Sequence, residues 1–185
     1  MTAQIPDSLI HEGEEFSIVG VRGKGLYRPE DFGMNSYSRC TACWRGHVMR
    51  YILIDDNLVL DRILLNAENP PNINGVEPQK IREVGTSIFD FSYNNLNLKA
   101  NFTGGILLAK DFIDEMYVHM GFQRPIAYRT VIEIKLENGF VISTRDLSKK
   151  MEEYRYKDSS KGAKPLSNSS QDIENWIKST FSLDY

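Results

Sequence analysis

Cysteine is scarce in this chain of 185 residues, which has only Cys40 and Cys43. Two cysteines this close together cannot build the disulfide framework of a small secreted protein, and they are consistent with a reducing compartment. The sequence also has no run of about 18 apolar residues that could span a bilayer, and its first residues lack the basic start and apolar stretch of a signal peptide. We therefore expect a cytoplasmic protein with no membrane partner.

An excess of basic residues is missing too. Lys and Arg together number 22 against 25 Asp and Glu, which gives a formal net charge of −3 at pH 7. This balance disfavours a nucleic-acid partner, although a local basic patch can be hidden within a balanced total. The apolar fraction of 41% and the charged fraction of 25% are ordinary for a globular protein, and the length is sufficient for one substantial core.

Signatures of catalysis and of cofactor binding are also absent. The sequence contains no G-x-x-x-x-G-K-[ST], G-x-G-x-x-G, G-x-S-x-G or H-E-x-x-H pattern. Two carboxylates held close together could perform acid–base chemistry, but the sequence alone does not place any two candidates side by side. The candidates are Asp55, Asp56, Asp111, Asp114, Glu115 and Glu133. We expect no cofactor and favour a protein that is not an enzyme.

The longest β-prone run lies at the centre of the expected sheet. From Val48 to Ile54 apolar side chains occur at both odd and even positions, which is typical of a strand covered on both faces. Asp55–Asn57 is a turn signal, and a second apolar run follows from Leu58 to Leu65, interrupted by Asp61 and Arg62. This pattern predicts a β-hairpin.

Two further hairpins are predicted on either side of a less clear segment. The alternation over residues 95–102, a turn at Thr103–Gly105 and the apolar run 106–109 predict one hairpin. The alternation over residues 128–136, followed by Asn138–Gly139 and a return strand over 140–144, predicts the other, because Asn-Gly supplies the positive φ angles of a type I′ turn. Between them, residues 110–122 are compatible with strand or helix, and we favour a helix.

The remaining segments complete the expected architecture. Residues 9–19 predict a short opening strand around a His-Glu-Gly turn, and residues 20–38 and 66–79 predict long loops, the second with the pair Pro70–Pro71. Asp146 is placed to cap a helix in which Leu147, Met151 and Tyr154 share one face.

The sequence thus predicts an α+β fold, a mainly antiparallel sheet of three hairpins with one or two packed helices and a C-terminal helix. We expect a single domain over residues 1–156, a polar linker over 157–168 and a helix over 169–185 that docks on the domain.

The pair Cys40-x-x-Cys43 could be half of a zinc site, which His47 and His119 would complete, or a redox dithiol. Zinc needs four converging ligands, and residues three apart on an extended strand point to opposite faces. No second C-x-x-C is present, and a redox motif would be followed by a helix where this pair precedes an expected strand. We expect small buried thiols and no metal.

The most distinctive tetrapeptide is Trp44-Arg45-Gly46-His47. Trp and Arg together suit a ligand or partner surface, through stacking and paired hydrogen bonds. Alternatively Trp44 belongs to the core, Arg45 is a paired charge and Gly46 marks a bulge or a close approach, and we favour this structural interpretation. His119, between Val118 and Met120, is more simply a hydrogen-bonded core histidine than a base.

Several segments resemble a group of small bacterial proteins for which no function is known. They are T-A-C-W-R-G-H at 41–47, F-T-G-G-I-L-L-A-K-D-F at 102–112, Y-V-H-M-G-F at 117–122 and V-I-E-I at 131–134. The resemblance extends over about residues 5–155 and implies a bacterial source, but no reaction, cofactor or catalytic residue. More loosely, the chain is similar to the α+β immunity proteins encoded beside bacterial contact-dependent toxins.

Two functions are therefore expected to compete. The first is a cytoplasmic protein-interaction module, an immunity or antitoxin-like inhibitor whose partner is a toxin or another macromolecule. The second is a small-molecule-binding protein or enzyme with a site around Arg45, His47, Asp111 and His119, beside Trp44, where loops meet the sheet.

Overall fold

The computed structural model describes residues 2–81, 87–119 and 121–157. The predicted C-terminal helix and nearly all of the predicted linker lie outside these residues. Ten strands of the described part form one sheet, in the order β10-β9-β8-β2-β1-β3-β4-β6-β5, with β7 beside β4. They are β1 (Ser8–His11), β2 (Glu14–Lys24), β3 (His47–Ile54), β4 (Asn57–Leu65), β5 (Gln79–Lys80), β6 (Phe91–Tyr93), β7 (Leu98–Lys99), β8 (Thr103–Phe112), β9 (Tyr128–Glu137) and β10 (Phe140–Asp146).

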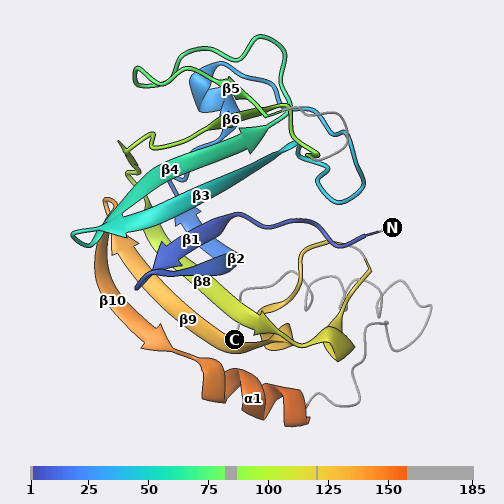
Figure 1. Cartoon of the computed structure of the whole chain (residues 1–185). Helices are drawn as coiled ribbons and strands as arrows, with labels where there is room; N and C mark the ends of the chain where they lie inside the picture. Colours follow the sequence, from blue (N-terminus) through green and yellow to red (C-terminus); the bar gives the residue numbers. More distant parts are fainter. Residues whose placement is uncertain (1, 82–86, 120, 158–185) are drawn as a thin grey trace.

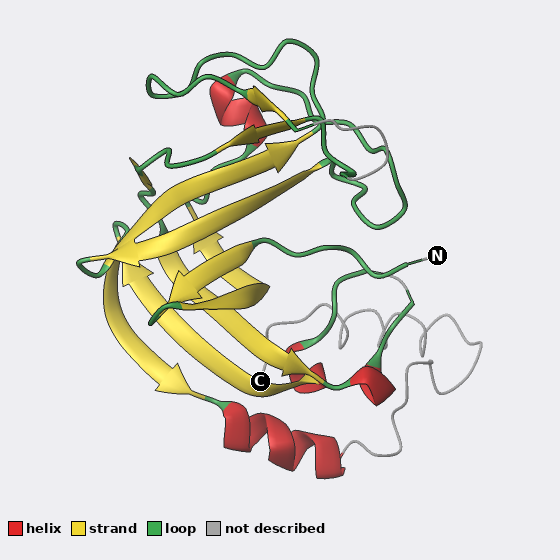
Figure 2. Cartoon of the chain, viewed as in Figure 1, coloured by secondary structure: helices red, strands yellow, loops and turns green. Residues whose placement is uncertain are grey.

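The helical elements of the described residues are few and short. They comprise one α-helix, α1 (Ser148–Lys157), which follows β10, and three 3-10 turns, η1 (Pro29–Phe32), η2 (Asp114–Met116) and η3 (Pro125–Ala127). Figure 2 shows α1 on the outside of the curved sheet and η1 beside the strands at its other end. The predicted fold class is confirmed, because a mainly antiparallel sheet is combined with a helix near the C-terminal end of the described chain.

The sheet bends until two of its strands meet at a corner. Phe140 at the start of β10 lies opposite Asn57 at the start of β4. The backbone N–H of Val141 donates to the carbonyl of Asp56 over 2.9 Å, and that of Leu58 donates to Gly139 over 2.8 Å. Figure 1 shows β3 and β4 converging with β8, β9 and β10 at this corner and diverging away from it, with β1 and β2 between them.

The core fills the inside of this bent sheet. On β8, Ile106 and Leu108 belong to the inner cluster, whereas Leu107 and Ala109 belong to a second cluster on the outer face. Leu147 and Met151 of the α1 segment cover that outer cluster. Successive side chains of a strand point to opposite faces, so one strand serves both cores.

Two predicted hairpins, β3–β4 and β9–β10, and the predicted helix after Asp146, which is α1, are confirmed. β3 and β4 pair across the turn at Asp55–Asp56, and β9 and β10 pair across Asn138–Gly139. Asp61 does not end β4. Arg50 lies opposite Arg62, and the next residue, Tyr51, lies opposite Leu60. The register therefore shifts by one residue, and Asp61 is the extra residue of a β-bulge.

The predicted second hairpin is wrong. Thr103–Gly105 forms the start of β8, where Gly104 lies opposite Gly23 of β2. The loop predicted for residues 20–38 is also too long, because residues 20–24 belong to β2. A Cβ atom on Gly104 would lie 2.0 Å from the carbonyl oxygen of Arg22, so glycine here allows two strands to approach closely. Of residues 95–102, only Leu98–Lys99 pair as a strand, because Asn95 and Asn97 adopt positive φ angles of 58° and 50°.

The helix favoured for residues 110–122 is also wrong. β8 continues to Phe112, which lies opposite Tyr128, and η2 and an irregular segment follow. Phe112 and Met116 pack on the outer cluster, and Val118 is buried. The helix-like spacing of these apolar residues therefore reflects burial on the outer face of the sheet rather than helical geometry, since strand pairing overrides a short periodic pattern.

Candidate functional site

A gap opens in the sheet where its shortest central strand begins. β1 has four residues and lies between β2, with eleven, and β3, with eight. It pairs antiparallel with β2 and parallel with β3, so residues before Ser8 are flanked by the later part of β2 and the first residues of β3. Beyond the start of β1, no strand of the described chain lies between those two, and residues of the segment after β2 line the opening.

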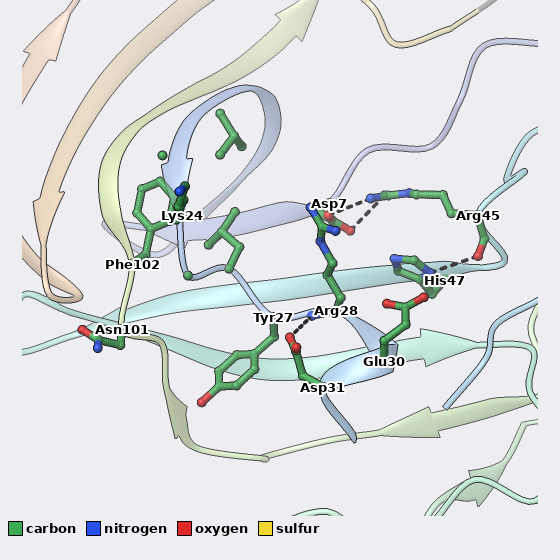
Figure 3. Close-up of a pocket in the computed structure, with 14 residues that line it drawn as sticks. Asp7, Lys24, Tyr27, Arg28, Glu30, Asp31, Arg45, His47, Asn101 and Phe102 are labelled. Atoms are coloured by element: carbon green, nitrogen blue, oxygen red, sulfur yellow. Dashed lines mark hydrogen bonds and ion pairs between the residues drawn. The ribbon is translucent and has the colours of Figure 1, made fainter. Parts of the chain in front are cut away.

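An open pocket of about 1020 Å³ occupies this region (Figure 3). Its lining comes from four separate parts of the chain: the residue before β1, the end of β2 with the following loop, the residues at the start of β3, and the two residues before β8. The charged or titratable lining residues are Asp7, Lys24, Tyr27, Arg28, Glu30, Asp31, Arg45 and His47, and apolar ones include Val21, Leu26 and Phe102.

One side of the pocket is fixed by an ion pair between Arg45 and Asp7. The Arg45 guanidinium donates to both carboxylate oxygens of Asp7, over 2.8 and 2.9 Å, and also to the carbonyl of Ile5. Asp7 accepts a further hydrogen bond of 2.7 Å from the backbone N–H of Met49. The Arg45 guanidinium also lies over the ring of Phe122, 5.3 Å from its centroid. Arg45 is thus a paired charge, as the structural interpretation predicted, and it also lines the pocket.

His47 has one ring nitrogen engaged by the protein. Its Nδ1 lies 3.0 Å from the carbonyl oxygen of Arg45 and 2.9 Å from Ser36 Oγ, and Ser36 Oγ itself donates to the same carbonyl. A carbonyl only accepts, so Nδ1 carries the proton and Nε2 is left with the lone pair. Figure 3 shows that second nitrogen on the side of Arg28.

The pKa of His47 is lowered, first by burial and then by the positive charge of Arg45, while Asp7 and Glu30 act in the opposite direction. The imidazole is therefore neutral at pH 7 and presents a hydrogen-bond acceptor. Ser36 is not an activated nucleophile, because its hydroxyl proton is given to a carbonyl and His47 Nδ1 is itself a donor.

Three charged side chains of the pocket are exposed and have no hydrogen-bond or ion-pair partner within the described chain, although Glu30 acts electrostatically on His47. The Lys24 ammonium, the Arg28 guanidinium and the Glu30 carboxylate make no hydrogen bond or ion pair with residues 2–81, 87–119 or 121–157. Asp31 differs, because its carboxylate accepts a 2.8 Å hydrogen bond from the backbone N–H of Arg28. In Figure 3, Lys24 lies at one end of the pocket, Glu30 and His47 lie at the other, and Arg28 lies between.

Gly46 sets the path of the chain between Arg45 and His47. Its φ is +68°, and a Cβ atom here would lie 2.1 Å from the carbonyl oxygen of Tyr37. The backbone N–H of Asn66 also donates to the carbonyl of Gly46 over 2.9 Å. The predicted close approach at Gly46 is confirmed, and it places the two flanking side chains on the pocket.

The other predicted site residues lie elsewhere. Trp44 is half exposed, so the prediction that it belongs to the core is wrong, and its backbone N–H donates to the side chain of Gln4 over 2.8 Å. Asp111 accepts a 2.7 Å hydrogen bond from Thr130 at the far end of β8. His119 is exposed and packs edge-on against Tyr117, so the prediction of a core histidine is also wrong. Arg45 and His47 line the pocket together, whereas Trp44, Asp111 and His119 are not among its lining residues.

The two cysteines form part of a turn that holds the N-terminal segment. The backbone N–H of Cys43 donates to Cys40, and that of Ile5 donates to Ala42. The Cys43 thiol is buried, which raises its pKa, and its Sγ donates to the carbonyl of His47 over 3.4 Å. Within the described residues no three His, Cys, Asp or Glu side chains gather closely enough to hold a metal ion.

Sequence reasoning missed most of the pocket. Asp7, Lys24, Arg28 and Glu30 carry no motif, and the last three fall in or beside the segment interpreted as a loop. The one available signal was the density of charge between the glycines of residues 20–33.

No helix in the described ranges is long and apolar enough to cross a membrane. Comparison of the chain with protein-family models, with curated proteins and with solved structures finds no match.

Proposed function

We propose that this chain binds a small polar molecule in the pocket at the start of β1. The observation that carries this proposal is that Lys24, Arg28 and Glu30 border the pocket without partners in the described chain. Charged groups that serve only the fold are normally paired or fully solvated, whereas groups that converge on a concavity are available to a ligand.

Binding is supported better than catalysis. The fixed groups at the pocket already have partners, because Arg45 is held by Asp7, and Ser36, which lies behind His47 and is not a lining residue, donates to the carbonyl of Arg45. His47 offers a lone pair at Nε2, but no hydroxyl or thiol of the described residues donates to it as a nucleophile would. The arrangement orients a ligand with rigid groups on one side and adaptable charged side chains on the other.

A matched pair of tryptophan variants tests the proposal. Val21 lines the pocket and is 39% exposed, so Val21→Trp fills part of the space, whereas Ile142→Trp changes an apolar side chain on β10 that is 58% exposed and does not line the pocket. A thermal-shift and calorimetric screen should include glucose, inorganic phosphate, citrate, 6-aminohexanoate and hexylamine. We expect at least one probe to bind wild type and Ile142→Trp equally and Val21→Trp at least about tenfold more weakly. Binding by no probe, or equal binding by all three proteins, would contradict the proposal.

A second candidate function is docking of an extended partner segment along β10. β10 pairs with β9 except at Ile142, where the register shifts, whereas β4 pairs with its other edge at Phe140 alone, and no other described strand covers that edge. Phe140 and Ile142 are 49% and 58% exposed. An exposed strand edge with apolar side chains accepts an added strand from a partner. An immunity or antitoxin-like role is the form of this candidate in which the added strand belongs to a toxin.

Peptide display tests this second candidate. Random peptides selected on the wild-type protein should lose at least about tenfold in affinity for Ile142→Lys. They should bind Tyr156→Lys unchanged, because Tyr156 is exposed on α1. Selection of no peptide, or of peptides indifferent to Ile142→Lys, would remove β10 as the docking edge.

A further inference from the structure

The pocket carries separated charges rather than a charge of one sign. Its lining has three cations, Lys24, Arg28 and Arg45, and three carboxylates, Asp7, Glu30 and Asp31. The Arg45–Asp7 pair neutralises itself, and the Asp31 carboxylate is turned toward the backbone N–H of Arg28. The charges left for a ligand are Lys24 at one end, Arg28 between the ends and Glu30 at the other end (Figure 3).

From this arrangement we propose that the ligand is a small zwitterion, an aminoalkyl acid whose acidic group faces Lys24 and Arg28 and whose ammonium group faces Glu30 and His47. The inference rests on the proposed function, because it names the class of molecule that the same pocket binds. The acidic group is a carboxylate or a phosphate, since both accept the hydrogen bonds that an ammonium and a guanidinium donate.

The end of the pocket near Glu30 is suited to an ammonium group. Glu30 supplies a carboxylate, and His47 Nε2 supplies a neutral lone pair because Nδ1 is bound to the carbonyl of Arg45. Figure 3 shows the Glu30 carboxylate directly beside the His47 ring. An ammonium group donates three hydrogen bonds and accepts none, so two acceptors placed together match it.

The pocket also has apolar lining, which suits a short hydrocarbon chain. Val21, Leu26 and Phe102 contribute it, with Phe102 beside Lys24, and Lys24 and Glu30 are at opposite ends in Figure 3. A ligand that spans these ends must separate its two charges by several bonds. This requirement distinguishes an aminoalkyl acid from an ion that carries both charges at one carbon.

Three probes that differ by one group each test the charge requirement. We expect 6-aminohexanoate to bind at least about tenfold more tightly than hexanoate, which lacks the ammonium, and than hexylamine, which lacks the acid. O-phosphoethanolamine compared with 3-aminopropanoate then distinguishes a phosphate from a carboxylate as the preferred acidic group. Affinity should fall as salt is raised, because both contacts are between charges near the surface.

Charge-neutralising variants show which end of the pocket binds the acidic group of the ligand and which end binds its ammonium group. Arg28→Gln and Lys24→Gln should reduce the preference for 6-aminohexanoate over hexylamine, and Glu30→Gln should reduce the preference for 6-aminohexanoate over hexanoate. Lys99→Gln and Glu12→Gln change exposed charges that are not among the lining residues and should reduce neither. Circular dichroism melting confirms that each variant is folded, and all these positions are exposed in the native structure.

The outcomes separate this inference from the proposed function. If glucose or citrate binds and Val21→Trp abolishes that binding, while 6-aminohexanoate does not exceed hexanoate and hexylamine, the pocket is a binding site and the zwitterion inference is overturned. If no probe binds, both are overturned. Tighter binding of 6-aminohexanoate that Glu30→Gln and Arg28→Gln reduce selectively is the result expected.

Discussion

Arg45 and Asp7 form a two-pronged ion pair that joins the segment before β1 to the start of β3, with nitrogen–oxygen distances of 2.8 and 2.9 Å. Asp7 also accepts a hydrogen bond from the backbone N–H of Met49. One carboxylate therefore links the chain to β3 just before Ser8, where the pairing of β1 with β3 begins. The pocket depends on this pair, because it fixes one side of the gap.

Replacement of Asp7 by Asn should lower the free energy of unfolding by about 1–3 kcal/mol, since it leaves a half-buried guanidinium without its counter-charge. The side chains of Arg45 and Asp7 are 27% and 22% exposed, so solvent moderates the loss. Urea denaturation measures the change. Glu14→Gln, which breaks the more exposed pair with Lys110, is the control and should cost less. Equal stability of Asp7→Asn and wild type would show that the pair does not hold the gap.

Gly46→Ala should destabilise the chain by about 3 kcal/mol or more, because it adds a Cβ to a residue with positive φ and places that atom against backbone. Gly13→Ala is a matched control. Gly13 has a φ of +81° but nothing within 4 Å of an added Cβ, whereas at Gly46 the carbonyl oxygen of Tyr37 would lie 2.1 Å away. The control should therefore cost only about 1 kcal/mol. Equal midpoints of denaturation for the two variants would argue against the close approach at Gly46.

The pH dependence of stability should report on His47. Its pKa is lowered in the folded state, so on acidification the unfolded chain takes up a proton first. The stability that neutral His47 provides is complete above about pH 6.5 and falls as the pH drops from there through the lower folded pKa. The groups facing the ring are Arg28, Arg45, Asp7, Glu30 and Ser36.

His47→Gln should flatten this decline in urea denaturation midpoints measured between pH 7 and pH 5. His11→Gln is the control, because His11 is on β1 and its ring contacts Phe16 rather than the pocket. A decline of unchanged slope in His47→Gln would rule out His47 as its source.

The two thiols should react unequally with a thiol reagent. Cys43 is buried, and burial raises its pKa, so it presents little thiolate. Cys40 is partly exposed. Under native conditions one thiol should react promptly, and peptide mass spectrometry should identify it as Cys40, with Cys43 reacting after unfolding in urea. Prompt labelling of Cys43 would mean that the turn over residues 40–43 opens readily.

Much of the sheet could be predicted where the signal was local. Asn138–Gly139 specified the turn between β9 and β10, and Asp146 caps α1 by accepting the backbone N–H of Ser148 over 2.8 Å. The meeting of β10 with β4 could not be predicted in this way, because Phe140 and Asn57 are brought together by the curvature of the whole sheet. Thr103–Gly105 was misassigned because the glycines there serve close contact between strands and do not form a turn.

The same distinction between local and long-range signals applies to the residues of the candidate site. Arg45 and His47 stood out because they lie in an unusual tetrapeptide, and they do line the pocket. Asp7 could not be identified from its surroundings in the sequence, since its role arises from the parallel pairing of β1 with β3. Lys24, Arg28 and Glu30 became candidates only when the path of the loop after β2 across the gap was known.

Calorimetric titration of 6-aminohexanoate shows directly whether the pocket at the start of β1 binds a small charged molecule. We expect saturable binding to wild type and to Ile142→Trp, with affinity at least about tenfold weaker for Val21→Trp and for Glu30→Gln. Absence of binding to wild type by this probe and by glucose, phosphate, citrate and hexylamine alike would contradict the proposed function.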